Sequence, residues 1–250
     1  MLLIVLHFQI KSFSNFQIKK TYIWLYKIDL MKKLLLIFVL IFSQNIFAQT
    51  AKEIIDKNIE LSGGLMQWKL LNSVLLQGKV ILGIKDEYSI KIYQQRPNLT
   101  KTIITIGGKE TAIEGYDGTK GYAMNYAANK LQEYKEYVAE SFDNDFIDWE
   151  NKGFNAQYLG KEKIGNIYCH KVELTKNVNK NIYYFDTKTF MILKEIKKDD
   201  TLLYSDYKRV GNLMMPFRIE SSSSKKDGDY VMILNKVEIN KVFPANIFKF

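Results

Sequence analysis

Cysteine and histidine are the residue types with the widest chemistry, and this chain has few of them. Cys169 is the only cysteine, and His170 is the only histidine after residue 48. The two are neighbours in a run typical of a strand, residues 168–174, so alternation points them to opposite faces of a sheet. A Cys–His dyad is therefore not expected. A single histidine also argues against a zinc site or a serine triad, and a single thiol allows no internal disulfide.

Acidic residues are the other candidates for chemistry, and they gather between residues 133 and 150: Glu133, Glu136, Glu140, Asp143, Asp145, Asp148 and Glu150. They lack the one-three-five spacing of a calcium loop, so the solvated face of a helix is the favoured interpretation. Any two acids can meet in space, so a glycosidase-type carboxylate pair stays open as an alternative that no motif supports. We therefore expect no enzyme activity, no metal and no cofactor.

Charge gives little support to a nucleic-acid partner. The whole chain has a net charge of +9, but six lysines and one aspartate lie within residues 1–48, so the remainder carries only +4. It has no clustered basic stripe and no nucleic-acid-binding motif. Attraction to anionic lipid headgroups remains an alternative to a solvated lysine surface.

Residues 31–48 have the pattern of a secretory signal peptide. Lys32 and Lys33 precede an apolar run over residues 34–42, and Ala48 offers a small residue before cleavage at Gln49. The run is too short to span a bilayer as a helix, although a retained anchor is the alternative. Residues 1–30 show no sustained periodicity and are interpreted as an over-extended start or a long leader. The mature protein, residues 49–250, is expected in the periplasm as a single domain, soluble and without a lipidated cysteine.

The periodicity of that domain changes after its first twenty residues. Residues 51–62 form an amphipathic helix ended by Gly63-Gly64, and a short second turn over residues 65–71 carries Trp68. Period-two alternation then predicts strands separated by turn residues. The predicted strands, roughly eleven antiparallel strands in all, cover residues 74–82, 88–95, 99–106, 110–116, 121–126, 156–159, 166–174, 181–185, 191–197, 202–208, 213–221, 230–234 and 237–242.

One segment interrupts the alternation. In residues 131–149, Ala139, Phe142, Phe146 and Trp149 recur at three- and four-residue spacing, which predicts a helical insertion with one apolar face. So many strands must close or split to protect their edges. The expected fold is mainly β (α+β): an incomplete antiparallel barrel wrapped over the N-terminal helix, with the insertion as a helical lid.

Several motifs, in this order, give the domain a family resemblance. They are Leu61-Ser62-Gly63-Gly64, Trp68, Leu71-Asn72-Ser73-Val74, Ile92-Tyr93-Gln94-Gln95-Arg96-Pro97-Asn98, Glu114-Gly115-Tyr116-Asp117-Gly118, Gly121-Tyr122, Tyr158-Leu159-Gly160-Lys161-Glu162, Tyr183-Tyr184-Phe185-Asp186, Ser205-Asp206-Tyr207 and Pro216-Phe217-Arg218-Ile219. In order and spacing, residues 51–250 resemble the outer-membrane lipoprotein-sorting proteins with the LolA/LolB-like fold. No single motif is specific.

The resemblance implies a periplasmic carrier or receptor for lipids or lipoproteins, with acyl chains held in a hydrophobic barrel cavity. It also implies transient contacts with the membrane or with envelope transport proteins. The acceptor branch of the family is anchored through a lipidated cysteine, which this chain lacks, so a soluble, monomeric carrier is favoured. The rival hypothesis is an exported sensor or interaction module of the same fold, with a filled core and a protein partner.

Candidate cavity residues are apolar positions that alternation places on strand faces. They are Trp68, Leu76, Val80, Leu82, Tyr88, Ile90, Ile92, Tyr122, Met124 and Tyr126, with Phe142, Phe146 and Trp149 as the lid. For each residue, ordinary core packing is the alternative, and for the lid a permanently packed helix. If Tyr88, Ile90, Ile92, Tyr122, Met124 and Tyr126 share one face, Met124→Glu or a bulky residue at Gly78 should abolish lipid uptake and leave the fold intact.

Overall fold

The computed structural model describes residues 51–83, 86–224 and 228–250. The predicted leader and signal peptide, residues 1–48, lie outside the described residues. The two predicted helical segments that follow the signal peptide are confirmed. The first helix covers residues 51–61, and α2 is Leu65–Leu70. Gly63 and Gly64, both at positive φ, separate them.

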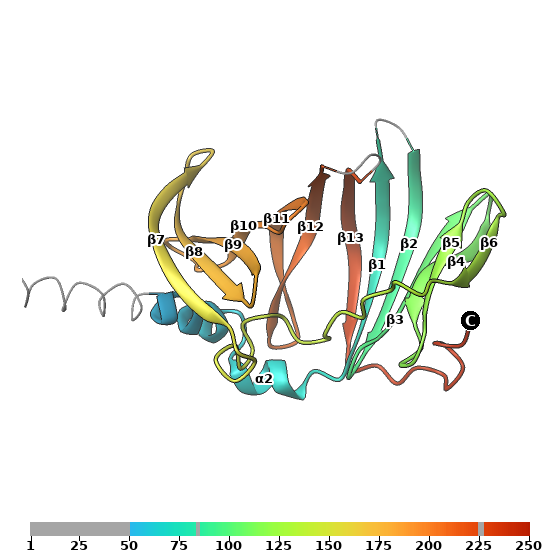
Figure 1. Cartoon of the computed structure of the whole chain (residues 1–250), viewed down its shortest axis with the longest axis horizontal. Coiled ribbons are helices and arrows are strands. Elements are labelled where there is room, and N and C mark those ends of the chain that lie inside the picture. The colour runs from blue at the N-terminus through green and yellow to red at the C-terminus, as the bar shows by residue number, and fades with distance from the viewer. Residues whose placement is uncertain (1–50, 84–85, 225–227) are drawn as a thin grey trace, which may run out of the picture. The chain divides into compact units, whose positions relative to one another are not determined.

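The described strands form one antiparallel sheet of thirteen (Figure 1). They are β1 (Ser73–Leu82), β2 (Asp86–Gln95), β3 (Leu99–Ile106), β4 (Lys109–Tyr116), β5 (Gly121–Asn125), β6 (Lys130–Glu133), β7 (Asn155–Ile164), β8 (Ile167–Lys176), β9 (Asn179–Asp186), β10 (Ile192–Ile196), β11 (Asp200–Val210), β12 (Leu213–Ser223) and β13 (Tyr230–Ile239). The spatial order is β6-β5-β4-β3-β2-β1-β13-β12-β11-β10-β9-β8-β7, so the sheet is open and its ends do not pair.

The strand order makes one pairing special. Strands β1–β6 and β7–β13 each form a run of sequential hairpins, and only the β1–β13 pairing joins the two runs within the sheet. Gly78 lies at an irregularity in this pairing, where the register shifts between Gln77 and Gly78. A Cβ at Gly78 would overlap the backbone of Ile233, so glycine is required for this close approach.

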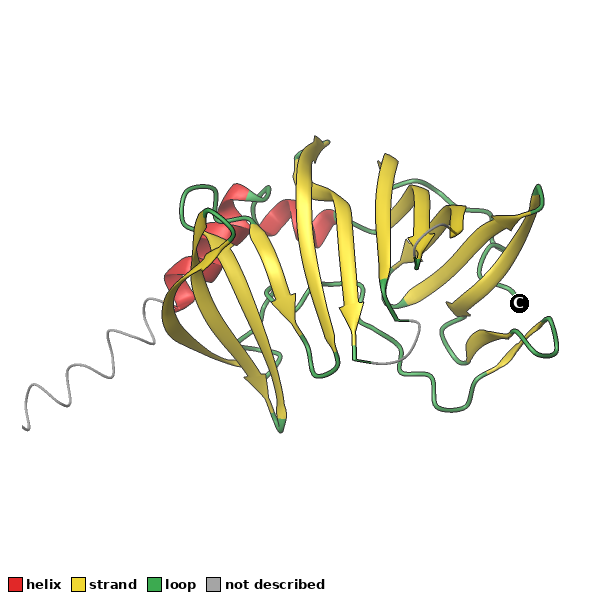
Figure 2. Ribbon diagram, turned by 90° about the horizontal axis from the view of Figure 1, so that it is seen from above, coloured by secondary structure: helices red, strands yellow, loops and turns green. Residues whose placement is uncertain are grey.

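The sheet has an inner and an outer face, which the registers identify. We call inner the face that carries Leu76, Phe217 and Tyr183, because the first helix packs against it at β8 and β9. There Ile54 and Ile55 are buried with Val172, Leu174 and Phe185. Figure 2 shows the helices running along the β7–β12 side of the sheet. A second cluster of buried residues fills the inner face of β13, β1, β2 and β3.

The C-terminal segment, residues 240–250, covers part of the outer face. The Phe243 ring meets Tyr93 at a centroid distance of 5.3 Å, and the Phe250 ring stacks on Tyr122 at 4.4 Å. Gly115 makes room for the Phe250 ring, since a Cβ there would overlap it. The outer face of β2–β5 is therefore also packed, although no strand pairs over it.

Residues 131–149 were predicted to form a helical insertion, and that prediction is wrong. Residues 131–133 belong to β6, and the segment between β6 and β7, residues 134–154, consists of turns and irregular backbone; we call this segment the strap. Asn144 explains the difference. Its side-chain oxygen accepts hydrogen bonds from the backbone N–H groups of Phe146 and Ile147 (3.1 and 3.2 Å), and this turn replaces helix hydrogen bonds. Asp148 adopts a positive φ of 53°, which also breaks a helix.

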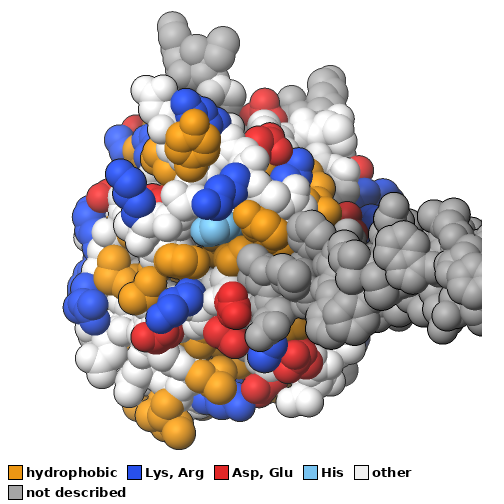
Figure 3. All heavy atoms as spheres, turned by 90° about the vertical axis from the view of Figure 1, so that its left-hand side faces the viewer, with side chains coloured by type: hydrophobic (Ala, Val, Ile, Leu, Met, Phe, Trp, Pro, Cys, Tyr) orange, Lys and Arg blue, Asp and Glu red, His pale blue; other side chains and the backbone are white. Residues whose placement is uncertain are grey.

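The strand count also departs from the prediction of about 11. The sequence pattern missed β6, which was assigned to the helical insertion, and it divided β13 into two strands. The long edge strand β7 carries Lys161, Glu162 and Lys163 near its end. In Figure 3, lysines and carboxylates are interspersed with apolar side chains on this end of the sheet. Such charges discourage pairing with another chain.

Candidate functional site

A cavity of about 660 Å³ lies between the inner face of β9–β12, the first helix, α2 and the strap. Its size falls in the ~300–1,000 Å³ range of small-molecule sites. Seven apolar residues line it: Trp68, Val138, Phe146, Met191, Ile192, Met214 and Pro216. The polar lining is as prominent, and comes from the strap, the first helix and strands β9–β11. The cavity is therefore amphipathic, with apolar and hydrogen-bonding walls.

Glu195 of β10 is the most buried carboxylate of the cavity wall, with a relative exposure of 6%. The hydroxyl of Tyr204 donates a hydrogen bond to it at 2.6 Å, and the Lys197 ammonium lies 3.0 Å away. Burial, followed by the charge of Glu195, raises the pKa of Tyr204. The nearby Glu195 carboxylate raises the pKa of Lys197 against the opposing effect of its burial. Both partners therefore stay protonated at neutral pH.

Asp145 brings a second carboxylate from the strap to the same wall. It accepts a hydrogen bond from the Tyr183 hydroxyl at 2.9 Å and another from the Asn181 amide at 3.4 Å. Burial is the main reason why the pKa of Tyr183 is raised, and the charges of Glu195 and Asp145 add to it. Tyr183 therefore remains a neutral hydrogen-bond donor, and its hydroxyl proton is engaged in the hydrogen bond to Asp145.

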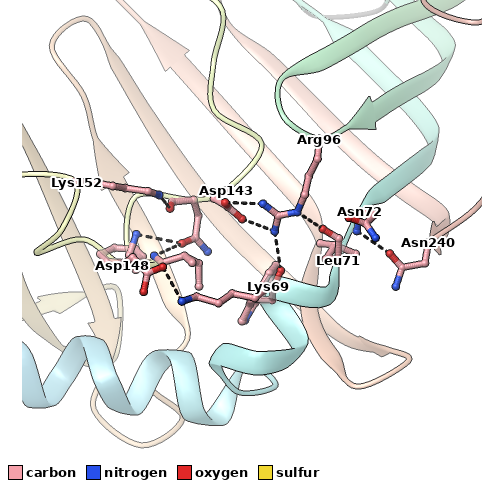
Figure 4. A network of polar contacts seen from close by, with 12 residues as sticks. Lys69, Leu71, Asn72, Arg96, Asp143, Asp148, Lys152 and Asn240 are labelled. Atoms are coloured by element: carbon pink, nitrogen blue, oxygen red, sulfur yellow. Dashed lines mark hydrogen bonds and ion pairs between the residues drawn. The ribbon is translucent and has the colours of Figure 1, made fainter.

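The strap is fastened to the sheet by Arg96, which follows β2 (Figure 4). The Arg96 guanidinium donates to both carboxylate oxygens of Asp143 at 2.6 Å, an arrangement that fits a planar fork. It also donates to the carbonyls of Leu71 (2.6 Å) and Trp68 (3.0 Å), at the end of α2. One side chain therefore holds the strap, the β2–β3 turn and α2 together.

Further contacts fix the strap on both sides of Asp143. The Lys69 ammonium of α2 lies 2.7 Å from the Asp148 carboxylate, and Lys152 donates to the carbonyl of Asn144 at 2.8 Å (Figure 4). At the start of the strap, Tyr137 stacks on Tyr116 at 5.7 Å and covers Gly121. The strap therefore crosses the inner face with anchors at both of its ends.

Two of the thirteen predicted site residues line the cavity, Trp68 and Phe146. Phe146 is 2% exposed and packs edge-on against Tyr183 and Phe185. The other two predicted lid residues lie on the strap without lining the cavity. Phe142 lies under the Arg96 guanidinium, and Trp149 packs against the core cluster below the first helix. The structure places the three together on one segment. Whether that segment opens stays a prediction.

Five predicted cavity residues lie on the inner face in the packed cluster beside the cavity: Leu76, Val80, Tyr88, Ile90 and Ile92. They meet Phe217, Met232 and Leu234 from β12 and β13. Leu82 lies at the end of β1 and is 39% exposed. These residues build the wall of the half-barrel, but they do not line the 660 Å³ space.

The last three predicted cavity residues, Tyr122, Met124 and Tyr126, do not share a face with Ile90 and Ile92, so that grouping is wrong. A one-residue bulge between β3 and β4 is the cause, because the register shifts between Thr102 and Ile103. Ile92 lies opposite Thr102 of β3, Thr102 lies opposite Glu114 of β4, and Glu114 lies opposite Ala123 of β5. Ala123 therefore shares the inner face with Ile92, and its neighbours Tyr122 and Met124 lie on the outer face. Tyr126 lies beyond β5 and is 74% exposed.

Most of the polar wall of the cavity was not predicted from the sequence. Asn58, Glu195 and Tyr204 belong to none of the quoted motifs, and Ser62 and Tyr207 were quoted only for the family resemblance. The burial of Glu195 follows from the strand pairing, which places this residue of β10 between Tyr183 of β9 and Leu202 of β11. Cys169 is fully buried, and burial raises the pKa of its thiol. No cluster of three metal-ligating side chains exists in residues 51–83, 86–224 and 228–250.

Comparisons with known proteins support the fold. No family model and no curated protein sequence matches the chain. Among solved structures, a domain of an outer membrane lipoprotein-sorting protein from Vibrio parahaemolyticus superposes with a TM-score of 0.54 at 11% identity, over 81% of this chain and 97% of that one. A LolA-superfamily protein from Nitrosomonas europaea gives 0.50 at 16%, over 82% and 98%. A DUF1329 family protein from Desulfovibrio piger gives 0.50 at 11%, over 80% and 97%.

The chain therefore shares its fold, an open antiparallel sheet, with these solved structures. At these identities the similarity establishes the fold alone. Within the described part of the chain, no helix is long and apolar enough to cross a membrane.

Proposed function

We propose that this protein is an exported, non-catalytic carrier that binds a lipid or the acyl chain of a lipoprotein under the strap. The observation that carries the proposal is the 660 Å³ amphipathic cavity between the strap and the inner face. An acyl chain on the apolar wall gains about 0.8 kcal/mol per buried methylene. Because association costs roughly 4–15 kcal/mol, such binding is reversible, as a carrier requires. The signal peptide pattern of residues 31–48 supports a periplasmic location.

The rival function is an interaction module that binds a protein partner. It is favoured by one observation, the close packing of the inner face of β13, β1, β2 and β3, where a carrier cavity was predicted. In a module of this kind, the remaining space under the strap would be incidental.

Native mass spectrometry of residues 49–250, purified from the organism's own envelope, tests the carrier proposal. We expect a co-purifying mass that dissociates as a lipid or an acylated peptide. A clean apo mass, together with no uptake of a neutral fluorescent amphiphile, would reject the carrier and favour the interaction module.

A matched pair of variants locates the uptake. Met214 lines the cavity, whereas Met124 lies on the outer face. Met214→Trp should fill part of the cavity and reduce uptake of the fluorescent amphiphile several-fold, and Met124→Trp should leave uptake unchanged. Equal uptake by the two variants would place the ligand elsewhere. Gly78, by contrast, is unsuitable as a probe, because a side chain there disrupts the β1–β13 pairing.

A further inference from the structure

The polar wall of the cavity has an unusual balance of charges for a protein whose residues 49–250 carry a net charge of +4. Four carboxylates line the cavity, those of Glu140, Asp143, Asp145 and Glu195, but Lys197 is the only lysine or arginine among the described lining residues. A cavity with one sign of charge and low-dielectric walls concentrates ions of the other sign. The lining therefore favours a positively charged ligand group.

Two of these carboxylates are already neutralised. Arg96 binds Asp143 with two hydrogen bonds, and Lys197 lies 3.0 Å from Glu195. Among the described residues, Asp145 and Glu140 have no lysine or arginine within ion-pairing distance. Asp145 is half-buried beside the fully buried Phe146, and Glu140 is exposed at the rim. The two carboxylates that a cationic ligand can neutralise therefore lie at the rim of the cavity (Glu140) and in its interior (Asp145).

Hydrogen bonding leads to the same conclusion independently of charge. The three tyrosines of the wall have used their protons: Tyr183 donates to Asp145 (2.9 Å), Tyr204 to Glu195 (2.6 Å), and Tyr207 to the carbonyl of Ile192 (2.7 Å). What the wall still offers is acceptor lone pairs, since each carboxylate oxygen can accept more than one hydrogen bond.

Asn58 extends this acceptor-rich wall onto the first helix. It lines the cavity and is 6% exposed, so nine-tenths of it is buried. Its amide nitrogen donates to the carbonyl of Phe190 at 2.7 Å, which leaves its amide oxygen as an acceptor. An ammonium group has three donors and no acceptor, and so complements such a wall.

We infer that the cavity binds a cationic amphiphile, with a primary ammonium head at the Asp145 carboxylate and the Asn58 amide oxygen and an aliphatic tail against Trp68 and Met214. This inference rests on the proposed carrier function and adds the charge class of the ligand. The aromatic rings of Trp68 and Tyr183 also favour a cation on the cavity wall. A fatty acid of the same length would bring its carboxylate against Asp145 and Glu195.

Isothermal titration of the mature protein with dodecylammonium and dodecanoate, below their micelle concentrations at pH 7.4 and low salt, tests the inference. We expect dodecylammonium to bind at least tenfold more tightly. Asp145→Asn should weaken dodecylammonium about tenfold and should not weaken dodecanoate. Tyr183 can still donate to the asparagine oxygen, so the variant should fold, and its melting curve checks this. Glu162→Gln, a carboxylate outside the cavity, is the matched control and should change neither affinity.

The outcomes of the titration distinguish a failure of this inference from a failure of the proposed carrier function. Equal or tighter binding of dodecanoate would contradict the inference but would still support the proposed carrier function. If neither amphiphile binds, the proposed carrier function is itself contradicted. Nα-acetyl-lysine amide has the primary ammonium head without the aliphatic tail. Tight binding of this compound would contradict an amphiphile and indicate a peptide ligand. Dodecyltrimethylammonium lacks donors, so it should bind less tightly than dodecylammonium if the acceptor wall recognises N–H groups. Equal affinity would contradict that recognition.

Discussion

Glu195 contributes a buried negative charge to the cavity wall, and its two partners compensate the desolvation of that charge. We expect Tyr204→Phe to lower the free energy of unfolding by about 1–3 kcal/mol, because the carboxylate loses a donor that water cannot fully replace. Urea unfolding at pH 7 measures this loss. Tyr168→Phe, at a site that is 57% exposed, is the matched control and should change stability little. Equal effects in both variants would show that the buried hydrogen bond contributes nothing.

His170 gives a pH dependence whose direction follows from its surroundings. Burial, and then the charge of Lys161, lowers the pKa of His170 in the folded state. The unfolded chain therefore binds more protons than the folded chain near the ordinary histidine pKa of about 6.5. The stability due to neutral His170 is present above that pH and is lost as the pH falls through the folded-state pKa.

The measurement compares urea unfolding of the protein and of His170→Gln at pH 7.5 and pH 5.0. Carboxylates titrate in both proteins, so only the difference between them reports on the histidine. We expect the unaltered protein to lose more stability on acidification than the variant. An equal loss in both would mean that the histidine keeps its ordinary pKa.

At the residue scale, the sequence predicts positions better than partnerships. Alternation around Cys169 and His170 was sufficient to place them at successive positions of one strand, β8. No local pattern shows that Tyr204 will donate to Glu195 or that Arg96 will reach Asp143, because these pairs form only when β10 meets β11 and the strap crosses the sheet. The polar half of the cavity was unpredictable for that reason.

The strap is the element whose anchoring has the clearest consequence for ligand entry. Arg96→Ala removes two hydrogen bonds to Asp143 and two to the end of α2. We expect faster amide hydrogen exchange in residues 140–148, with unchanged protection in β1 and β13. Lys69→Ala, which removes only the exposed ion pair with Asp148, should have a much smaller effect. Unchanged exchange in Arg96→Ala would show that packing alone holds the strap.

A substitution at Phe146 tests whether the strap is packed as part of the core or only covers the cavity. It is 2% exposed and contacts two aromatic rings of β9, so Phe146→Ala should cost about 3–5 kcal/mol. Phe142→Ala, at the half-buried contact with Arg96, should cost clearly less. Thermal or urea unfolding of the two variants gives the comparison. Similar, small losses would mean that the strap contributes little to the fold.

At the element scale, the strands were predictable because alternation and turn residues are local. The prediction of residues 99–106 coincides with β3. The strap was not predictable, since apolar residues at helical spacing occur there in a backbone that Asn144 and Asp148 hold in turns. The bulge opposite Thr102 was likewise invisible, and it moved Tyr122 and Met124 to the other face.

The integrity of the whole sheet depends on the β1–β13 pairing, and Gly78 tests it. Gly78→Ala places a methyl group against the backbone of Ile233, so we expect a loss of about 1–3 kcal/mol or a protein that does not fold. Lys79→Ala, an exposed neighbour on the same strand, should cost less than about 1 kcal/mol. Circular dichroism melting distinguishes the two. A stable Gly78→Ala protein would show that the two strands can move apart there without cost.

The same pairing has a consequence for the order in which the molecule can form. Val74, near the start of the domain, lies opposite Ile239, near its end. The hairpins on each side are local and can form early, but the centre of the sheet needs a contact between distant parts of the chain, which makes folding slow. Until the last strand has left the ribosome, the two half-sheets each expose a central edge.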